Sequence, residues 1–295
     1  MGEIAALATG ILWAFTSVFF TLAGRRVGAV VVNRTRLLAA LLFLTLTHTV
    51  LQGKLFPLPI EPQRFFWLSV SGIIGLALGD AALFHALVLV GPRITTLLMA
   101  AVPVISTFLA WAFLGERLTS FELLAVGITV GGIAWVVAEK RSNSVGQEGK
   151  QYALGILAGL GGAVGQAVGL VTAKKGLTGD FPPISGVVIR MVAATAVMWL
   201  WTLLKGEGRS TIQRARSGKA LLLIVAGAFV GPFLGVWLSL IAIDSTLVGL
   251  ASTLMALTPI FVIPLVRIVF HERVSIRAVL GTLVAMVGVA MIFML

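Results

Sequence analysis

The sequence predicts an all-α integral membrane protein with ten transmembrane helices, arranged as two inverted five-helix repeats. Three observations predict this fold class: an apolar composition, ten apolar segments long enough to cross a bilayer, and a residue pattern of the first half of the chain that returns in the second half. A soluble domain could not cover so much apolar surface, so the expected architecture is a helical bundle in lipid.

The composition indicates which solvent surrounds the folded chain. Of its 295 residues, 59% are hydrophobic and 11% are charged, and the mean hydropathy is +1.07. The net charge of +11 could suggest nucleic acid, but the Lys and Arg residues lie in short segments between apolar runs and form no separate basic domain. We therefore expect a lipid bilayer as a partner, loop charges that orient the helices, and no nucleic-acid partner.

Ten apolar runs define the expected helices. A helix needs about 20 apolar residues to cross roughly 30 Å of hydrocarbon, and it satisfies its own backbone hydrogen bonds there. The expected helices are residues 4–23, 29–50, 65–90, 94–114, 121–138, 152–173, 184–204, 221–243, 247–270 and 274–295. The first run is long enough to span and has no basic segment before it, so we expect it to remain as a helix rather than be cleaved as a signal peptide.

Sequence motifs for catalysis are missing. The chain has no cysteine, which excludes disulfides, thiol catalysis and cysteine-bound metals. It has no Walker loop, no HExxH or GxSxG motif and no metal-ligand spacing. We predict that the protein is not an enzyme, that it has no catalytic residue, metal site or cofactor, and that this chain alone does not pump with ATP.

The two halves of the chain repeat one pattern. A polar segment at 140–151 lies near the midpoint, and it separates an expected domain 1–140 from an expected domain 151–295. The last two helices of each half match at the spacing that separates Pro103 from Pro259, which is 156 residues. Pairs at this spacing include Met99 and Met255, Glu116 and Glu272, Arg117 and Arg273, Gly132 and Gly288, Gly75 and Gly231, and Gly79 and Gly235. The second helices match at 154 residues, with Arg36 on Arg190, and the first helices match at 149, with Gly10 on Gly159.

An odd number of helices in each repeat has a geometrical consequence. The second repeat must enter the membrane from the side opposite the first, so the two halves are expected to be inverted. Inverted repeats are a recurrent architecture of transporters, in which a central site can open alternately to either side of the membrane. This fold-level analogy favours a transport function.

The repeated segments carry a resemblance to a known family. LMAAVPVISTFLAWAFLGERLTSFELLAVGITVGGIAWV and LMALTPIFVIPLVRIVFHERVSIRAVLGTLVAMVGVAMI resemble the EamA-type repeat of the drug/metabolite transporter superfamily. The matching features are a proline in the fourth helix, a glutamate at its end and a fifth helix with spaced glycines. The resemblance covers nearly the whole chain, and it implies a ten-helix transporter with both termini in the cytoplasm.

Charged residues inside the apolar runs are the first candidates for a site. An ionisable side chain at the centre of a membrane helix costs about 2.5–3.5 kcal/mol on insertion scales, so it needs a partner or a wet cavity. Asp80 is the best candidate for proton coupling or for contact with a solute amine, and a salt bridge to Arg36 is the alternative. His85 could titrate near neutral pH, but it is some 140° around the helix from Asp80. Arg36 and Arg190 could bind a solute carboxylate or phosphate, snorkel to headgroups, or lock helix ends.

Two prolines are candidate hinges. Pro103 and Pro259 fall near the middle of the fourth and ninth runs, where a proline removes one backbone hydrogen bond and kinks the helix. A kink there could let half-helices pivot or expose carbonyl groups to a solute, and simple packing is the alternative.

Aromatic and other uncharged residues complete the candidate site. Trp13, Gln166, Trp237 and Met255 lie inside runs rather than at their edges. Tryptophan normally favours the membrane interface, so deep tryptophans could line a pocket for a solute with a ring. Ordinary helix packing is the favoured alternative for these residues. The glycines at small-xxx-small spacing are expected mainly to let helices approach closely.

Location and orientation follow from the runs and the charges. We expect a multi-pass protein of the cell (inner) membrane, present as a monomer or homodimer. Most Lys and Arg residues fall in loops on the side opposite the N-terminus, so the positive-inside rule places both termini outside. The family resemblance implies the reverse, and the two indications conflict.

The sequence thus favours a secondary transporter, an exporter or exchanger of a small metabolite such as an amino acid, that works by alternating access. A coupling proton is a possible second partner. The alternatives are a multidrug exporter, an organic-phosphate or nucleotide-sugar exchanger, and a passive channel.

Overall fold

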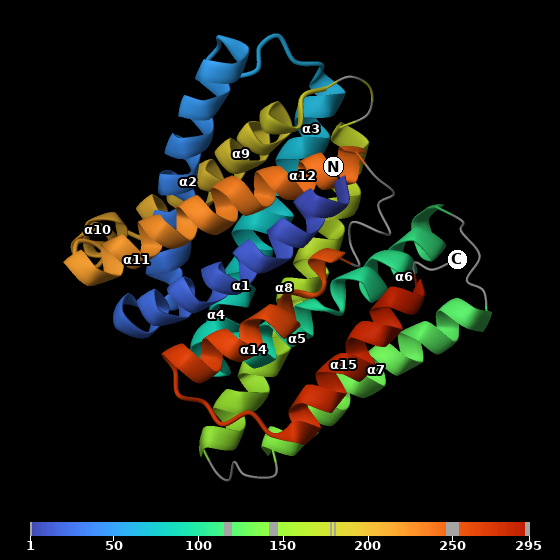
Figure 1. Cartoon of the computed structure of the whole chain (residues 1–295). Coiled ribbons are helices and arrows are strands. Elements are labelled where there is room, and N and C mark those ends of the chain that lie inside the picture. The colour runs from blue at the N-terminus through green and yellow to red at the C-terminus, as the bar shows by residue number, and fades with distance from the viewer. Residues whose placement is uncertain are drawn as a thin grey trace.

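The computed structural model describes residues 2–114, 120–141, 147–177, 179, 181–245 and 254–292. These residues form a bundle of helices, and no strand occurs among them (Figure 1). Membrane helices need no partner for their backbone groups, so the long apolar runs fold locally into helices and then pack through their side chains.

The first half of the chain contributes five helical stretches, of which the third and fourth consist of several segments. They are α1 (Gly2–Val27), α2 (Ala29–Gln52), the series α3 (Pro62–Ser71), η1 (Gly72–Gly79) and α4 (Asp80–Leu89), the pair α5 (Gly91–Met99) and α6 (Val102–Leu114), and α7 (Ser120–Arg141). The second half contributes α8 (Gln147–Gly176), α9 (Pro183–Leu204), the short α10 (Gly208–Ala215), the series α11 (Gly218–Ala228), η2 (Phe229–Gly235) and α12 (Val236–Ser245), then α14 (Thr258–Val269) and α15 (Ile276–Ile292).

Each expected apolar run overlaps a helix, but the helices differ in length. Six are long and apolar enough to cross a membrane, and four shorter apolar helices lie at Gly91–Ser106, Leu123–Ala138, Thr258–Val269 and Ile276–Met291 within the described ranges. The protein is therefore a multi-pass membrane protein, and the crossing of the membrane by all ten runs remains a prediction.

The helices of one half pack mainly between helices of the other half. α1 packs against α11, η2, α12 and α14, and Figure 1 shows it lying between α11 and α14. In the same way α8 packs against α3, η1, α4, α5 and α6. Two further large contacts join equivalent helices, α2 with α9 and α7 with α15. Exchanging the two halves therefore maps the contacts of α1 onto those of α8, and maps the α2–α9 and α7–α15 contacts onto themselves.

Residue contacts between α7 and α15 are also related by the repeat. A Cβ atom added at Gly132 would lie 2.5 Å from Ala285 N, and one added at Gly288 would lie 2.5 Å from Thr129 N. Thr129 and Ala285 are separated by the same 156 residues as Gly132 and Gly288. The two backbones therefore touch at two glycines related by the repeat, as small residues permit where lipid gives little drive for helices to associate.

The third stretch of each half contains a π-helical segment that the sequence did not predict. η1 ends at Gly79, directly before Asp80, and η2 ends at Gly235, directly before Val236. The repeat places Asp80 and Val236 at equivalent positions. π-helical turns widen a helix locally and are frequent at functional sites.

The hinge prolines do not lie in the middle of continuous helices. Ala100 and Ala101 separate α5 from α6, and Pro103 is the second residue of α6. Pro259 is likewise the second residue of α14, after a turn at Ala256 and Leu257. At the first turn of a helix, a proline lacks only an N–H that has no partner anyway, so these prolines begin half-helices rather than kink whole ones. Within the described ranges, Pro264 of α14 and Pro232 of η2 lie inside helices.

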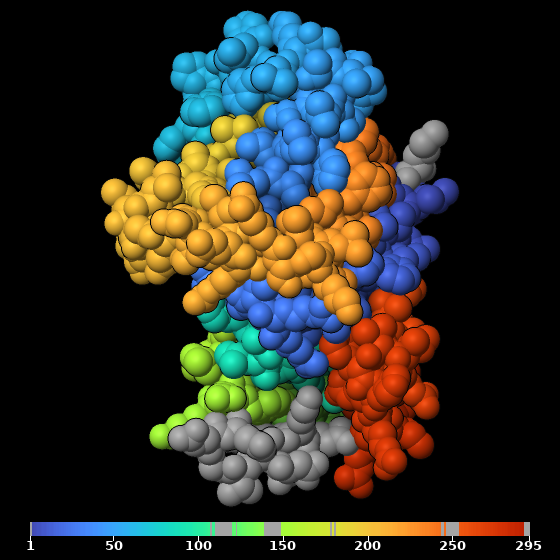
Figure 2. Space-filling model, turned by 90° about the vertical axis from the view of Figure 1, so that its left-hand side faces the viewer, coloured from blue at the N-terminus to red at the C-terminus, as the bar shows by residue number. Residues whose placement is uncertain are grey.

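Two segments between helices differ from expectation. Helices α7 and α8 extend into the polar segment 140–151, of which 142–146 lies outside the described residues together with Glu116 and Arg117. The basic loop 205–219 contains helix α10, which turns Thr211 and Ala215 inward and exposes Ile212 and Arg214. In Figure 2 the gold residues of α10 project from one side of the molecule, beside the start of α11.

Candidate functional site

A buried ion pair lies where α2 meets the junction of η1 and α4. Arg36 Nη2 lies 2.5 Å from Asp80 Oδ2, and the two side chains are 2% and 6% exposed. Asp80 is the first residue of α4, so the widened π-helical turn ends directly before its carboxylate. A buried pair of this kind is stable only when further hydrogen bonds compensate the loss of water.

Those further hydrogen bonds are present around Arg36. Its Nε and Nη2 donate to Asn33 Oδ1 at 3.1 and 2.9 Å, and Nη2 also donates to the carbonyl of Leu76 at 2.6 Å. Asn33 Nδ2 in turn donates to the carbonyl of Ala77 at 3.2 Å, and the guanidinium stacks over the Phe84 ring at 5.0 Å. Arg36 is therefore fixed by α2, η1 and α4 together.

The second half of the chain reaches this carboxylate through Gln166. Gln166 Nε2 on α8 donates a hydrogen bond to Asp80 Oδ1 at 2.8 Å. Close approach of two glycines makes the contact possible, since a Cβ atom at Gly165 would lie 2.6 Å from Gly79 Cα. Each oxygen of Asp80 is thus bound by a different half of the protein.

Arg190 approaches the same region from α9 but has a different environment. It is 2% exposed, and its Nε is a buried nitrogen without a hydrogen-bond partner. Its Nη2 would lie 3.7 Å from a Cβ atom added at Gly75, and its charge interacts with that of Asp80 without forming a salt bridge. Arg36, Asp80, Gln166 and Arg190 are therefore gathered from four helices into one buried polar cluster.

The other expected site residues lie apart from this cluster. His85 is exposed, and its Nδ1 contacts the carbonyl of Ala81 at 2.8 Å on its own helix. Trp13 and Met255 pack together in an apolar group between α1, α12 and the residues before α14. Trp237 packs beside Phe233, with ring centroids 6.0 Å apart, in the apolar group that joins α2, η1, α9 and η2.

Sequence reasoning missed Asn33 and Phe84. A signal existed for Asn33, which lies three residues before Arg36 and therefore on the same helix face. Phe84 had a similar signal, because it lies four residues after Asp80. The approach of Gln166 to Asp80 joins residues 86 positions apart and depends on the packing of the two halves.

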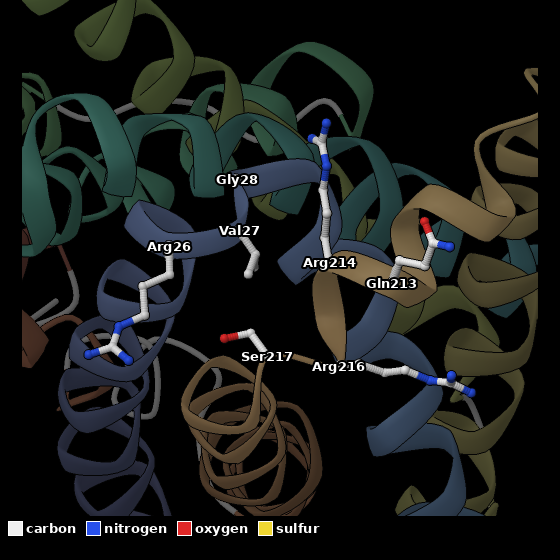
Figure 3. Close-up of a pocket in the computed structure, with 7 residues that line it drawn as sticks. All are labelled: Arg26, Val27, Gly28, Gln213, Arg214, Arg216 and Ser217. Carbon is white, nitrogen blue, oxygen red and sulfur yellow. The ribbon is translucent and has the colours of Figure 1, made fainter.

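The described surface also has an open pocket of about 630 Å³ at the end of α1, lined by residues of the α10–α11 connection. Three arginines line it, but Figure 3 shows that the guanidinium groups of Arg26, Arg214 and Arg216 point away from one another. The pocket shares no residue with the buried cluster. An anion in it would meet no converging donors, so the buried cluster is the stronger candidate site.

The fold and the site define a class of protein: a multi-pass helical membrane protein of two related halves that enclose a buried polar cluster. A model of the EamA-like transporter family matches residues 1–138 and 153–294, and the chain belongs to this family. Members of the family are transporters of small solutes and not enzymes, so this chain is a membrane transporter with a small-molecule solute and lipid as partners.

One solved structure has a similar fold but a low sequence identity. This structure, titled "Crystal structure of protein", has a TM-score of 0.66 and 19% sequence identity, and the alignment covers 98% of this chain and 95% of the other. At this identity the likeness shows a shared fold. No curated protein matches the sequence.

Proposed function

We propose that the protein is a secondary transporter, an exporter or exchanger of a small metabolite such as an amino acid, in the cell membrane. The observation that carries this proposal is the buried cluster of Arg36, Asp80, Gln166 and Arg190, which residues from both halves build. Charged residues inside a membrane helix bundle commonly mark the path of a solute or ion. A cluster shared between two halves can change its exposure when the halves move.

Alternating access between inverted halves, 1–140 and 151–295, is the proposed mechanism. The halves interdigitate through glycine-lined contacts, as at Gly79 and Gly165, where no side chain has to be displaced for the helices to slide. The turn before Pro103 divides the fourth stretch into α5 and α6, and a turn also precedes Pro259 at the start of α14, so these helices can tilt separately. A single central site would then face each side of the membrane in turn.

A transmembrane gradient is the proposed energy source. Asp80 is the acidic group of the cluster, so a coupling proton would act through this carboxylate. Protonation of Asp80 would remove its charge from the pair with Arg36, so binding of the proton would loosen this pair and release of the proton would tighten it.

Counterflow in proteoliposomes tests the proposal. The purified protein is first screened against a metabolite library by thermal shift, and the hits are then tested as labelled solutes with unlabelled solute trapped inside. A carrier gives saturable uptake that is accelerated by solute on the far side. Flux that does not saturate and shows no such acceleration would instead establish a passive channel.

A further inference from the structure

Arg36 and Arg190 hold equivalent positions in the two halves but have unequal surroundings. Arg36 has a complete set of partners in Asp80, Asn33 and the Leu76 carbonyl. Arg190 forms no hydrogen bond or salt bridge from its guanidinium within the described part of the chain. The two halves therefore each bury an arginine, but only Arg36 has protein side chains that bind its guanidinium within the described part of the chain.

The repeat itself identifies what the second half lacks. Asp80 follows η1 as the first residue of α4, and Val236 follows η2 as the first residue of α12. Asn33, three residues before Arg36, corresponds to Val187, three residues before Arg190. Both valines pack in the apolar group that joins α2, α9, η1 and η2. The second half has kept the cation and has valines in place of both side chains that bind its counterpart.

The charge of the cluster is consequently unbalanced. It contains two arginines and one aspartate, so one positive charge lacks a counter-ion among the described buried residues. His48 is the buried histidine in this part of the chain, and its two ring nitrogens contact the carbonyl of Lys54 and the hydroxyl of Ser185 instead. An unpaired buried charge is unfavourable in protein and more so in lipid, which favours a ligand that supplies a negative charge.

Glycine backbone, rather than a side chain, faces Arg190 on the side of Gly75. Its Nη2 points toward Gly75, and the Cβ position of Gly75 is 3.5 Å from Gly169 Cα and 3.7 Å from the carbonyl of Gly165. Gly75 thus faces the guanidinium, and Gly165 and Gly169 of α8 lie behind Gly75, so none of the three contributes a side-chain atom there. The planar fork of an arginine matches the two oxygens of a carboxylate or phosphate.

We propose that Arg190 binds an oxyanion group, a carboxylate or phosphate, of the transported solute, which takes the place that Asp80 occupies beside Arg36. This inference rests on the proposed transport function and specifies its substrate class. The solute completes the missing half of the internal symmetry, so the cluster becomes electrically neutral when a monoanion is bound. Arg36 and Asp80 neutralise each other and leave Arg190 for the solute.

The test uses counterflow in proteoliposomes with a panel that includes glutamate, succinate and inorganic phosphate, together with the methyl ester of each carboxylate solute that is transported. We expect transported solutes to carry a carboxylate or phosphate, and esterification to raise KM on the order of a hundredfold, as for loss of a buried charged hydrogen-bonded pair. Equal transport of a solute and of the ester that lacks all its carboxylate charges would overturn the inference while leaving the transport function intact. Absence of counterflow for every solute would count against the proposed function instead.

Three variants and one control localise the effect. Arg190→Gln should raise KM by a similar factor, and Arg190→Lys should recover part of the loss because the charge remains. Gly75→Ala adds a methyl group 3.7 Å from Arg190 Nη2 with no contact shorter than 3.5 Å, so it should fold and raise KM without a matching fall in kcat. Arg209→Gln removes an exposed arginine of α10 and should leave KM unchanged. Unaltered KM in folded Arg190→Gln would refute the role of this residue.

Val236→Asp provides a separate test, because Val236 is the residue of the second half that is equivalent to Asp80. The new carboxylate should pair with Arg190 as Asp80 pairs with Arg36, raise the thermal unfolding midpoint, and abolish the stabilisation that a transported anion gives to the wild-type protein. A Val236→Asn variant, which has the same shape without the charge, should not raise the midpoint. Retention of anion-induced stabilisation in Val236→Asp would contradict the proposal.

Discussion

Gln166 Nε2 lies 2.8 Å from Asp80 Oδ1, so the acidic group of one half is hydrogen bonded to a residue of the other half. The opposite oxygen of the carboxylate is bound by Arg36 of its own half. A movement of the two halves relative to each other would therefore stretch the bond to Gln166 before it affects the ion pair. The number of hydrogen bonds to the Asp80 carboxylate therefore depends on the relative position of the two halves.

The ion pair should contribute a measurable coupling energy. In a double-mutant cycle of Arg36→Gln and Asp80→Asn, each single variant leaves one buried charge without its partner, which typically costs about 3–5 kcal/mol. The double variant removes both charges, so its free energy of unfolding should fall by clearly less than the sum of the single losses. Unfolding in detergent by denaturant or heat measures all four proteins, and additive losses would show that the two residues do not interact.

The glycine contacts between α7 and α15 should be equally sensitive in the two halves. Gly132→Ala and Gly288→Ala each place a methyl group 2.5 Å from a backbone nitrogen, so both should lower stability by about 1–3 kcal/mol, as overpacking does. Gly131→Ala is the matched control, because a Cβ atom there has no neighbour within 4 Å, and its effect should be neutral or slightly stabilising. Thermal unfolding midpoints compare the three, and a control as unstable as the other two would disprove the packing argument.

Prolines at the start of a helix and inside it should differ on replacement. Pro259→Ala should change stability by less than about 1 kcal/mol, because the first turn of a helix tolerates proline. Pro264→Ala, five residues further along α14, restores an N–H that can bond within the helix and should stabilise the protein by up to roughly 3 kcal/mol. If Pro259 is also a hinge, Pro259→Ala should slow counterflow while the affinity for solute is unchanged. Equal stability changes in the two variants would contradict the helix break before Pro259.

The contact between α2 and α10 should depend on pH. Arg34 Nη2 donates a hydrogen bond to Glu207 Oε2 at 2.6 Å, and chiefly for this reason the pKa of Glu207 lies below its ordinary value of 4.5. A carboxylate whose pKa is lowered by folding stabilises the protein above its unfolded pKa, and this stabilisation disappears as the pH falls through the folded pKa. The unfolding midpoint should therefore decline as the pH falls below about 4.5, and Glu207→Gln should flatten that decline.

High salt offers the complementary measurement for this contact. Because the Glu207 side chain is 45% exposed, ions screen the pair, and the difference between wild type and Glu207→Gln should shrink as salt is added. An acid decline that is identical in the two proteins would assign it to another group.

The sequence was most informative where lipid imposes simple rules. The apolar runs form helices because a backbone in lipid must make its hydrogen bonds within its own segment. Repeated pairs such as Gly132 and Gly288 predicted two related halves, and the contacts between helices have the same relation. Arg36 and Asp80 stood out because charges are rare in such runs.

Features that depend on packing between segments could not be predicted in this way. Residues Gly72–Gly79 are compatible with α- and π-helix alike, and the choice depends on what packs against them. A Cβ atom at Gly72, for example, would overlap the carbonyl of Arg190. The helix breaks before Pro103 and Pro259 were expected as kinks because the sequence does not show where a helix begins anew. The bond between Gln166 and Asp80 required both halves to be in place.

The interdigitation of the halves also constrains the order in which the protein can be made. Helix α1 leaves the ribosome before the other described helices, yet its neighbours α11, η2, α12 and α14 begin only at Gly218, about 190 residues after α1 ends. During synthesis, much of the surface of α1 that packs in the finished bundle must therefore contact lipid or an insertion chaperone until those helices are made. Co-translational assembly can pair α2 with η1 and α4 early, but the bundle closes only when the last helices insert. Truncation near the C-terminus should thus disturb the environment of the first helix as much as that of the last.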